Sequence, residues 1–152
     1  MKSVVFCSSQ RFKNEMEEFI RELRSCAEKK DLHIVIFEPN FEKRTQEFLN
    51  QHEKDRLGDP LYRTTVAEKV YDHLFRKVRI ADVCFIFNKN GYIGINTSGE
   101  LFAAAALGKT VYALDDRMRM GHYPHDLYEE PSPQKLVHEV VETPPKLLAR
   151  LM

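Results

Sequence analysis

A glycine-bearing segment at residues 91–100, GYIGINTSGE, carries the residue types best suited to chemistry. Its glycines let backbone approach a ligand closely, and the helix expected after it offers unpaired N–H groups to an anion. Glu100 places a carboxylate at that helix start, where it could act as a nucleophile or a general base. Thr97 and Glu100 also fit a capping box, in which the two side chains satisfy backbone donors at a helix N-terminus. Spacing alone favours the capping box.

A second polar turn, Ser8-Ser9-Gln10-Arg11, follows the first apolar run of the chain. Serine hydroxyls, helix-start N–H groups and an arginine could together hold a phosphate. The residues by themselves favour a simpler interpretation, in which Ser9 caps a helix and Arg11 is a solvated surface charge.

Histidines and cysteines give weaker signals. His122 and His125 offer two imidazoles, but the proline between them spoils a helical spacing, so we predict no metal site and no cofactor. The segment 115–132 around them is long enough for a lid over an aromatic ligand, or it is an ordinary loop. Cys7 and Cys84 fall in apolar runs and are interpreted as core residues.

The elements that must position these groups alternate along the chain. Short β-branched and aromatic runs predict strands at residues 4–7, 32–37, 82–87 and 110–114. Apolar residues at steps of three and four predict helices at 12–27, 66–78, 101–107 and 133–141, with a further exposed helix within 38–61.

This alternation predicts an α/β fold, a three-layer Rossmann-like or flavodoxin-like open parallel sheet of four to five strands with helices on both faces. In such sheets ligands bind beyond the carboxyl ends of the strands, which is where both polar segments fall. Residues 1–143 are expected to form a single domain. The Pro144-Pro145 pair is expected to set apart a tail at 144–152.

Length and charge narrow the class of protein. The chain has 152 residues, and its 23 basic and 23 acidic side chains balance, which argues against a general binder of nucleic acid. No apolar run is long enough to span a membrane, and the N-terminus does not resemble a secretory leader. Three widely spaced cysteines suit reduced thiols, so we expect a cytoplasmic protein without membrane partners.

Three stretches carry a resemblance to a known family. They are residues 6–11 (FCSSQR), residues 81–83 (ADV) and residues 94–109, where a glycine loop and Glu100 precede an alanine-rich helix and Gly108-Lys109. The pattern resembles the nucleoside 2-deoxyribosyltransferase family, including the related deoxynucleoside 5′-monophosphate N-glycosidases. The resemblance covers most of residues 3–114 and leaves 38–61 and the C-terminal part unmatched.

The resemblance implies a two-step glycosyl transfer on a small nucleoside or nucleotide. Glu100 would attack the anomeric carbon and expel the base, and a second base or water would then release the sugar. The family is commonly homo-oligomeric, so a homodimer or higher homo-oligomer is implied as well. The substrate-binding residues would be Ser8, Ser9, Arg11, Gly91, Tyr92, Gly94, Asn96, Thr97 and Ser98.

The sequence departs from the family pattern at three positions. The acid that usually lies on the helix before the third strand is replaced by Leu74. The nearest acids are Asp72 and Glu68, which face differently on a helix, and Asp72 is the candidate for protonating the leaving base. Gly94 stands where transferases have an acid, and Phe102 stands where a glycine is common. These departures keep a non-catalytic nucleotide-sensing domain open as an alternative. A phosphoribohydrolase of the cytokinin-activating type is a third, although its double-glycine motif is not reproduced.

Overall fold

Five short strands pair in parallel in the computed structural model, which describes residues 1–41, 43–116 and 135–152. They are β1 (Val4–Cys7), β2 (Ile36–Phe37), β3 (Val83–Ile86), β4 (Thr110–Ala113) and β5 (Glu139–Val140). Their order in the sheet is β2-β1-β3-β4-β5. The predicted α/β class and open parallel sheet are confirmed.

The strand order reverses between β1 and β3. The chain moves from β1 to its neighbour on one side, β2, and then crosses back to β3 on the other side. Connections on opposite faces leave a crevice beyond the carboxyl ends of these two strands, where such folds bind ligands. The register pairs Val4 with Val83 and Cys7 with Ile86, so both strands end at the same edge.

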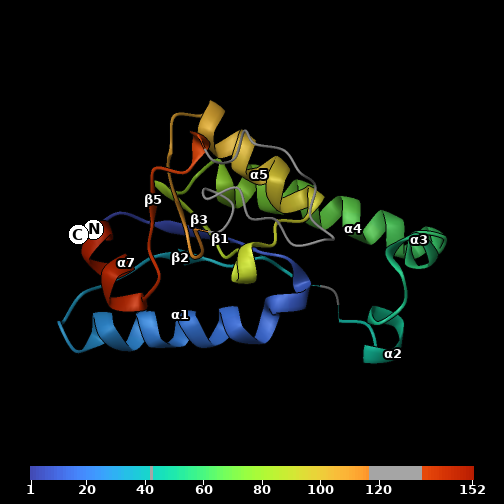
Figure 1. Ribbon diagram of the computed structural model, residues 1–152, viewed down its shortest axis with the longest axis horizontal. Coiled ribbons are helices and arrows are strands. Elements are labelled where there is room, and N and C mark those ends of the chain that lie inside the picture. Colours follow the sequence, from blue (N-terminus) through green and yellow to red (C-terminus); the bar gives the residue numbers. More distant parts are fainter. Residues whose placement is uncertain (42, 117–134) are drawn as a thin grey trace.

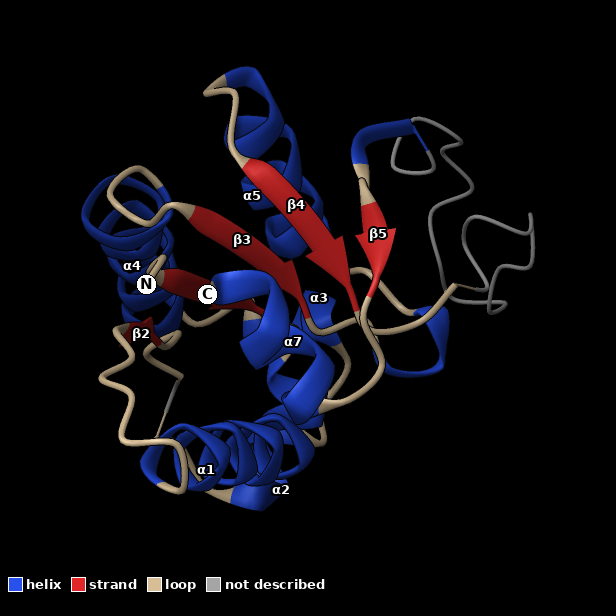
Figure 2. Cartoon of the chain, turned by 90° about the vertical axis from the view of Figure 1, so that its left-hand side faces the viewer, coloured by secondary structure: helices blue, strands red, loops and turns tan. Residues whose placement is uncertain are grey.

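Helices cover both faces of the sheet (Figures 1 and 2). One layer holds α1 (Lys13–Glu28) and α7 (Pro144–Leu151). The other holds α4 (Pro60–His73), which continues into a π-helical turn (Leu74–Val78), and α5 (Ile95–Ala106). Alternate residues of β1 serve the two layers: Val4 and Phe6 pack with α1 and α7, while Val5 and Cys7 pack with α5.

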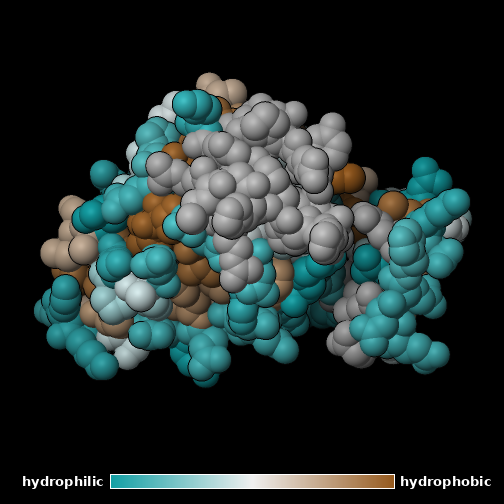
Figure 3. Space-filling model, in the orientation of Figure 1, coloured by the Kyte–Doolittle hydropathy of each residue, from teal (hydrophilic) through white to brown (hydrophobic). Residues whose placement is uncertain are grey.

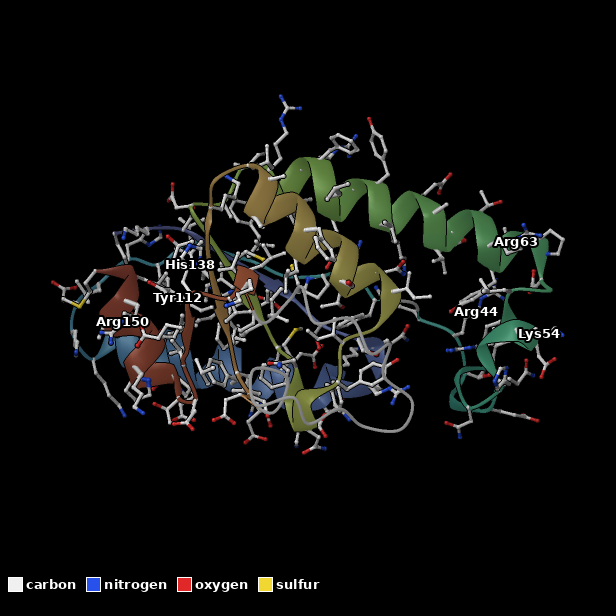
Figure 4. All side chains as sticks on the ribbon, turned by 45° about the horizontal axis from the view of Figure 1, so that its top comes forward. Arg44, Lys54, Arg63, Tyr112, His138 and Arg150 are labelled. Atoms are coloured by element: carbon white, nitrogen blue, oxygen red, sulfur yellow. The ribbon has the colours of Figure 1, made fainter. Side chains whose placement is uncertain are left out.

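The charged segment before α4 forms two short helices rather than one exposed helix. These are α2 (Gln46–Leu49) and α3 (Glu53–Arg56), beyond the edge of the sheet in Figure 1. Asp59 then begins α4 by accepting hydrogen bonds from the N–H groups of Leu61 and Tyr62, and it pairs with Arg44 at 3.6 Å. Figure 4 shows Arg44 and Lys54 at this end of the molecule, near the start of α4.

Two predictions about the C-terminal part are wrong. The helix expected at 133–141 does not extend to its end, because Glu139–Val140 form β5 beside β4. The tail expected at 144–152 is instead α7, an integral part of the core whose Leu147, Leu148 and Leu151 are fully buried against the α1 side of the sheet. Two prolines at a helix start are compatible with helix, since the first N–H groups have no intrahelical partner.

The two ends of the chain lie side by side in Figure 1. The Lys2 N–H donates to the Leu151 carbonyl at 2.8 Å.

The strand expected at 32–37 is shorter than predicted and pairs with β1 only through Ile36 and Phe37. Polar side chains cover the α1 edge and the α2–α3 end in Figure 3. Within the described residues, no helix has the length and apolar character needed to cross a membrane.

The burial of α7 gives the first testable prediction. Leu148→Ala should lower the free energy of unfolding by about 2–5 kcal/mol, because it empties a fully packed site in the core. Lys146→Ala on the same helix is the control, since its side chain is 63% exposed. Urea unfolding measures both variants. Equal effects of the two substitutions would mean that residues 144–152 are a tail after all.

Candidate functional site

Glu100 lies in the second turn of α5, further into the helix than the sequence predicts. The helix begins at Ile95, with Gly94 as an extended N-cap residue and no side-chain cap hydrogen bond. Thr97 is therefore inside the helix, and the capping box favoured by spacing is not formed. Thr97, Glu100, Leu101 and Ala104 form the buried stripe of α5, at steps of three and four residues. Glu100 thus faces the sheet and is only 8% exposed.

Two buried side chains from distant segments meet Glu100. His73 is the last residue of α4, and its Nε2 lies 3.8 Å from Glu100 Oε2. Cys7 ends β1, and its Sγ lies 3.5 Å from the same His73 Nε2. The thiol, imidazole and carboxyl atoms all lie within 4.8 Å of one another. The three elements meet beside the β1–β3 reversal of strand order, where the fold class places ligands.

Burial controls the protonation of this cluster. It raises the pKa of Glu100 from 4.5 to about 7, an effect that hydrogen bonding to Cys7 partly offsets. It lowers the pKa of His73 from 6.5 to about 4, with a further lowering by the positive charge of Lys77. At neutral pH the imidazole is therefore uncharged. Despite its short distance, the His73–Glu100 contact is then not an ion pair.

Cys7 belongs to the same desolvated environment. Burial, followed by the neighbouring Cys84, raises the pKa of its thiol well above the ordinary value, so the thiol is protonated at neutral pH. Cys84 Sγ lies 3.7 Å from Cys7 Sγ, and both cysteines are fully buried. The expectation that they are core residues describes their burial but misses the contacts of Cys7 with the site.

The first polar turn and the glycine segment meet beside this cluster. Ser9 caps a 3₁₀ turn (Gln10–Phe12) by accepting from the Arg11 N–H, and Ser8 Oγ donates to the Phe87 carbonyl beyond β3 at 3.3 Å. The Arg11 guanidinium lies over the Tyr92 ring, 3.7 Å from its centre. The structure therefore brings the predicted Arg11 and Tyr92 together and attaches the turn to β3.

A tight turn places Tyr92 for this contact. It follows a 3₁₀ turn (Lys89–Gly91) in which Asn90 has φ 58° and Gly91 has φ 79°. Positive φ at two successive positions is the left-handed region, which suits asparagine and glycine. The backbone conformation of this turn is therefore the reason for a glycine at position 91.

Asn88 is a structural residue that sequence reasoning missed. It is fully buried, and its Oδ1 accepts from the N–H groups of Leu114 and Asp115 at 3.0 Å each. Its Nδ2 donates to the Asp115 carbonyl at 3.1 Å. These bonds fix the carboxyl end of β4 to the loop after β3. An asparagine directly after an apolar strand was the available signal.

Asp72, the predicted proton donor, is engaged elsewhere. It pairs with Arg76 at 3.2 Å and with Lys77 at 3.7 Å. Its neighbour His73 is the α4 residue that contacts Glu100. Successive residues on an α-helix are rotated by about 100° around the helix axis, so the side chains of Asp72 and His73 point in different directions.

The remaining predicted residues are spread around the start of α5. Ser98 N–H donates to the Gly94 carbonyl within the first turn, and Asn96 is exposed. Asn96 lines an open groove of about 670 Å³ with apolar side chains of α4, among them Val66 and Val70, and with Leu74 of the π-helical turn. Glu100 does not line this groove. His122, His125 and the predicted lid around them lie outside the described residues.

Comparison with known proteins finds likeness in structure only. No protein-family model matches the sequence, and no curated protein matches it either. A conserved protein from Enterococcus faecalis V583 is 16% identical, with a TM-score of 0.52 over 99% of this chain and 97% of that one. The likeness establishes a shared fold.

Two named enzymes are also among the similar structures. A 2-deoxyribosyltransferase from Bacillus psychrosaccharolyticus is 16% identical over 96% of this chain and 90% of its own, with a TM-score of 0.49. The CMP N-glycosidase BcmB from Clostridium botulinum is 13% identical over 98% of both chains, with a TM-score of 0.43.

The buried carboxyl group should be visible in the pH dependence of stability. Burial raises the folded-state pKa of Glu100 from 4.5 to about 7. The contribution of this carboxyl group to the free energy of unfolding is therefore fully present below pH 4.5 and is lost as the pH rises through 7. Glu100→Gln removes this loss. Its free energy of unfolding relative to the unaltered protein should therefore increase by up to about 3 kcal/mol between pH 4.5 and 7.5.

Urea unfolding across this pH range measures the difference. Taking the difference between variant and unaltered protein cancels the opposite contribution of His73, whose lowered pKa stabilises the fold above pH 6.5 and is lost as the pH falls through 4. Glu142→Gln, an exposed carboxylate on the same chain, is the control. A pH-independent difference for Glu100→Gln would show that its carboxyl titrates normally.

Proposed function

We propose that this protein cleaves the N-glycosidic bond of a nucleoside or nucleotide, with Glu100 as the nucleophile. The observation that carries the proposal is the buried carboxyl group of Glu100, held beside the point where the strand order reverses. A desolvated carboxyl group at such a crevice is costly, which favours a functional role for it over a structural one. The resemblance of residues 94–109 to the deoxyribosyltransferase pattern supports the same chemistry.

The proposed reaction has two steps. In the first, the ionised Glu100 carboxylate bonds to the anomeric carbon while the bond to the base nitrogen breaks, and the base leaves with the electron pair and takes up a proton. In the second, water or another base attacks the same carbon and releases Glu100. The sugar develops positive charge in both transition states, and a carboxylate in a site of low polarity stabilises that charge strongly.

His73 acts as a positioning residue in this scheme. Its neutral imidazole lies 3.8 Å from the Glu100 carboxyl group, and with a pKa of about 4 it is too weak a base to take the Glu100 proton, which is lost to water instead. Because the pKa of Glu100 is about 7, a large fraction of the carboxyl groups is ionised at neutral pH. The imidazole is thus the α4 side chain in contact with the proposed nucleophile, one residue before the position of the family acid, where this chain has Leu74.

The sugar or a 5′-phosphate would lie against the two polar segments. We assign Ser8, Ser9 and Arg11 to this side, because the turn is tied to the end of β3 and its arginine is exposed beside Tyr92. Tyr92 would then offer its ring to the substrate. Gly94, Asn96 and Ser98, at the start of α5, complete the candidate set.

A non-catalytic nucleotide sensor is the second candidate. The engagement of Asp72 with Arg76 and Lys77 favours it, because among the described residues this candidate acid is then not directed at a leaving base. A phosphoribohydrolase is a variant of the enzymatic proposal with a ribosyl-5′-phosphate substrate. The implied homo-oligomer stays a prediction.

Base release tests the proposal directly. The protein is incubated with a panel of ribonucleosides, deoxynucleosides and their 5′-monophosphates, and free base is measured by chromatography. Glu100→Gln should lower kcat by at least about 10³-fold with little change in fold, because the amide cannot form the glycosyl ester. Glu142→Gln is the matched control. Base release that survives in Glu100→Gln excludes the mechanism, and a thermal shift without base release supports the sensor.

Substitutions of His73 and Asp72, which are neighbours on α4, test which of the two side chains assists the reaction. The structure indicates His73, and the sequence alone indicates Asp72. His73→Asn should lower kcat by more than about tenfold and move its pH profile, because the imidazole contacts the nucleophile. Asp72→Asn should have the smaller effect, because Asp72 pairs with Arg76 and Lys77 and not with the nucleophile. The measurement is kcat against pH for both variants. The reverse order of effects would restore Asp72 as the proton donor.

A further inference from the structure

The cluster of Cys7, His73 and Glu100 offers a second kind of chemistry. All three side chains are buried, and their ligand atoms lie within 4.8 Å of one another. Thiolate, imidazole and carboxylate are the three ligand types that zinc takes in proteins. The residues come from β1, α4 and α5, so their positions in the sequence form no spacing motif.

Two of the three separations within the cluster are close to those around a zinc ion. Tetrahedral coordination at ordinary bond lengths places a sulfur and a nitrogen ligand about 3.6 Å apart, and a nitrogen and an oxygen ligand about 3.4 Å apart. Cys7 Sγ and His73 Nε2 are 3.5 Å apart, and His73 Nε2 and Glu100 Oε2 are 3.8 Å apart. For these two pairs zinc requires shifts of about a few tenths of an ångström, and it would draw Cys7 Sγ and the Glu100 oxygen, which lie within 4.8 Å of each other, to about 3.6 Å.

Cys84 lies next to the proposed sulfur ligand, Cys7. Its Sγ lies 3.7 Å from Cys7 Sγ. A metal-bound Cys7 is a thiolate, so the Cys84 thiol then donates the hydrogen bond and the Cys7 sulfur accepts it. Three protein ligands leave one tetrahedral position for water, which is the pattern of an open zinc site.

We propose that Cys7, His73 and Glu100 bind one Zn²⁺ or a similar thiophilic divalent cation, and that the bound cation blocks nucleophilic attack by Glu100. Binding sends the Cys7 thiol proton, and any proton on Glu100, to water. It also occupies a carboxylate oxygen that attack on a sugar needs. The blocking half of the proposal rests on the proposed function, whereas the binding half does not.

Cobalt tests the binding half without any reference to activity. Titration of the full-length protein with Co²⁺ should give thiolate-to-cobalt charge-transfer absorption that saturates at one ion per chain and is displaced by Zn²⁺. Cys7→Ser should abolish this absorption, and His73→Ala and Glu100→Gln should weaken binding by more than about 100-fold. Cys84→Ala should weaken it by about 10–100-fold as a supporting residue.

Cys26→Ser is the matched control, because Cys26 packs with the opposite face of the sheet. It should leave the cobalt spectrum unchanged. Circular dichroism checks the fold of each variant, and His73→Ala carries the test where Cys7→Ser does not fold. A missing charge-transfer band in the unaltered protein, or a band that a folded Cys7→Ser protein retains, overturns the site.

Zinc inhibition tests the blocking half. Zn²⁺ at about ten times its Kd should lower base release by about tenfold, and a chelator should restore it. In Cys7→Ser the rates with and without zinc should differ by less than about twofold at the same concentration. Cobalt binding with base release unaffected by zinc overturns the block. Absence of base release under all conditions overturns the proposed function, and the cobalt result then decides the metal site independently.

Discussion

The parallel pairing of β1 with β3 is the constraint on which the rest of the structure depends. These strands are adjacent in the sheet but 75 or more residues apart in the chain, as the Val4–Val83 register shows. Parallel neighbours need long crossover connections, and these place α1 on one face and α4 on the other. The carboxyl ends of β1 and β3 therefore share one edge, and the polar residues that follow each strand come together there.

The same pairing explains why a carboxyl group is buried. Cys7 ends β1 on the face that α5 covers, and the buried stripe of α5 places Glu100 against it. The end of α4 closes the third side with His73. At neutral pH the imidazole is neutral and the thiol is protonated, so Glu100 is the one member of the cluster that ionises, and the cost of burial is reduced.

The two uses that we propose for the cluster share one chemical basis and exclude each other. A carboxylate near its own pKa can lose a proton and attack an electron-poor carbon, and the same carboxylate with a thiol and an imidazole can hold a soft cation. Both uses depend on desolvation, because low polarity strengthens the interaction of the carboxylate with a developing positive charge as well as with a metal ion. The two cannot operate at once on one carboxylate oxygen.

The sequence by itself determined the class of fold and the most informative segment of the chain. Apolar runs such as 82–87 and helical stripes such as 12–27 are local patterns, and each reports burial directly. The start of α5 was misplaced because a capping box and an interior helical turn share the same residue types. Residues 144–152 are predicted as a tail, although they form α7, because the apolar stripe of Leu147, Leu148 and Leu151 is short and follows two prolines.

Only the tertiary structure decided which residues surround Glu100. Cys7 and His73 had no partner that spacing could reveal, because their contacts with each other and with Glu100 depend on strand pairing and on the phase of two helices. A shift of one residue on α4 would exchange His73 for Asp72 at the site. The sequence thus offered Glu100 only as one candidate carboxylate at a helix start, and the packing of α4 and α5 on β1 decided that it would be buried beside a thiol and an imidazole.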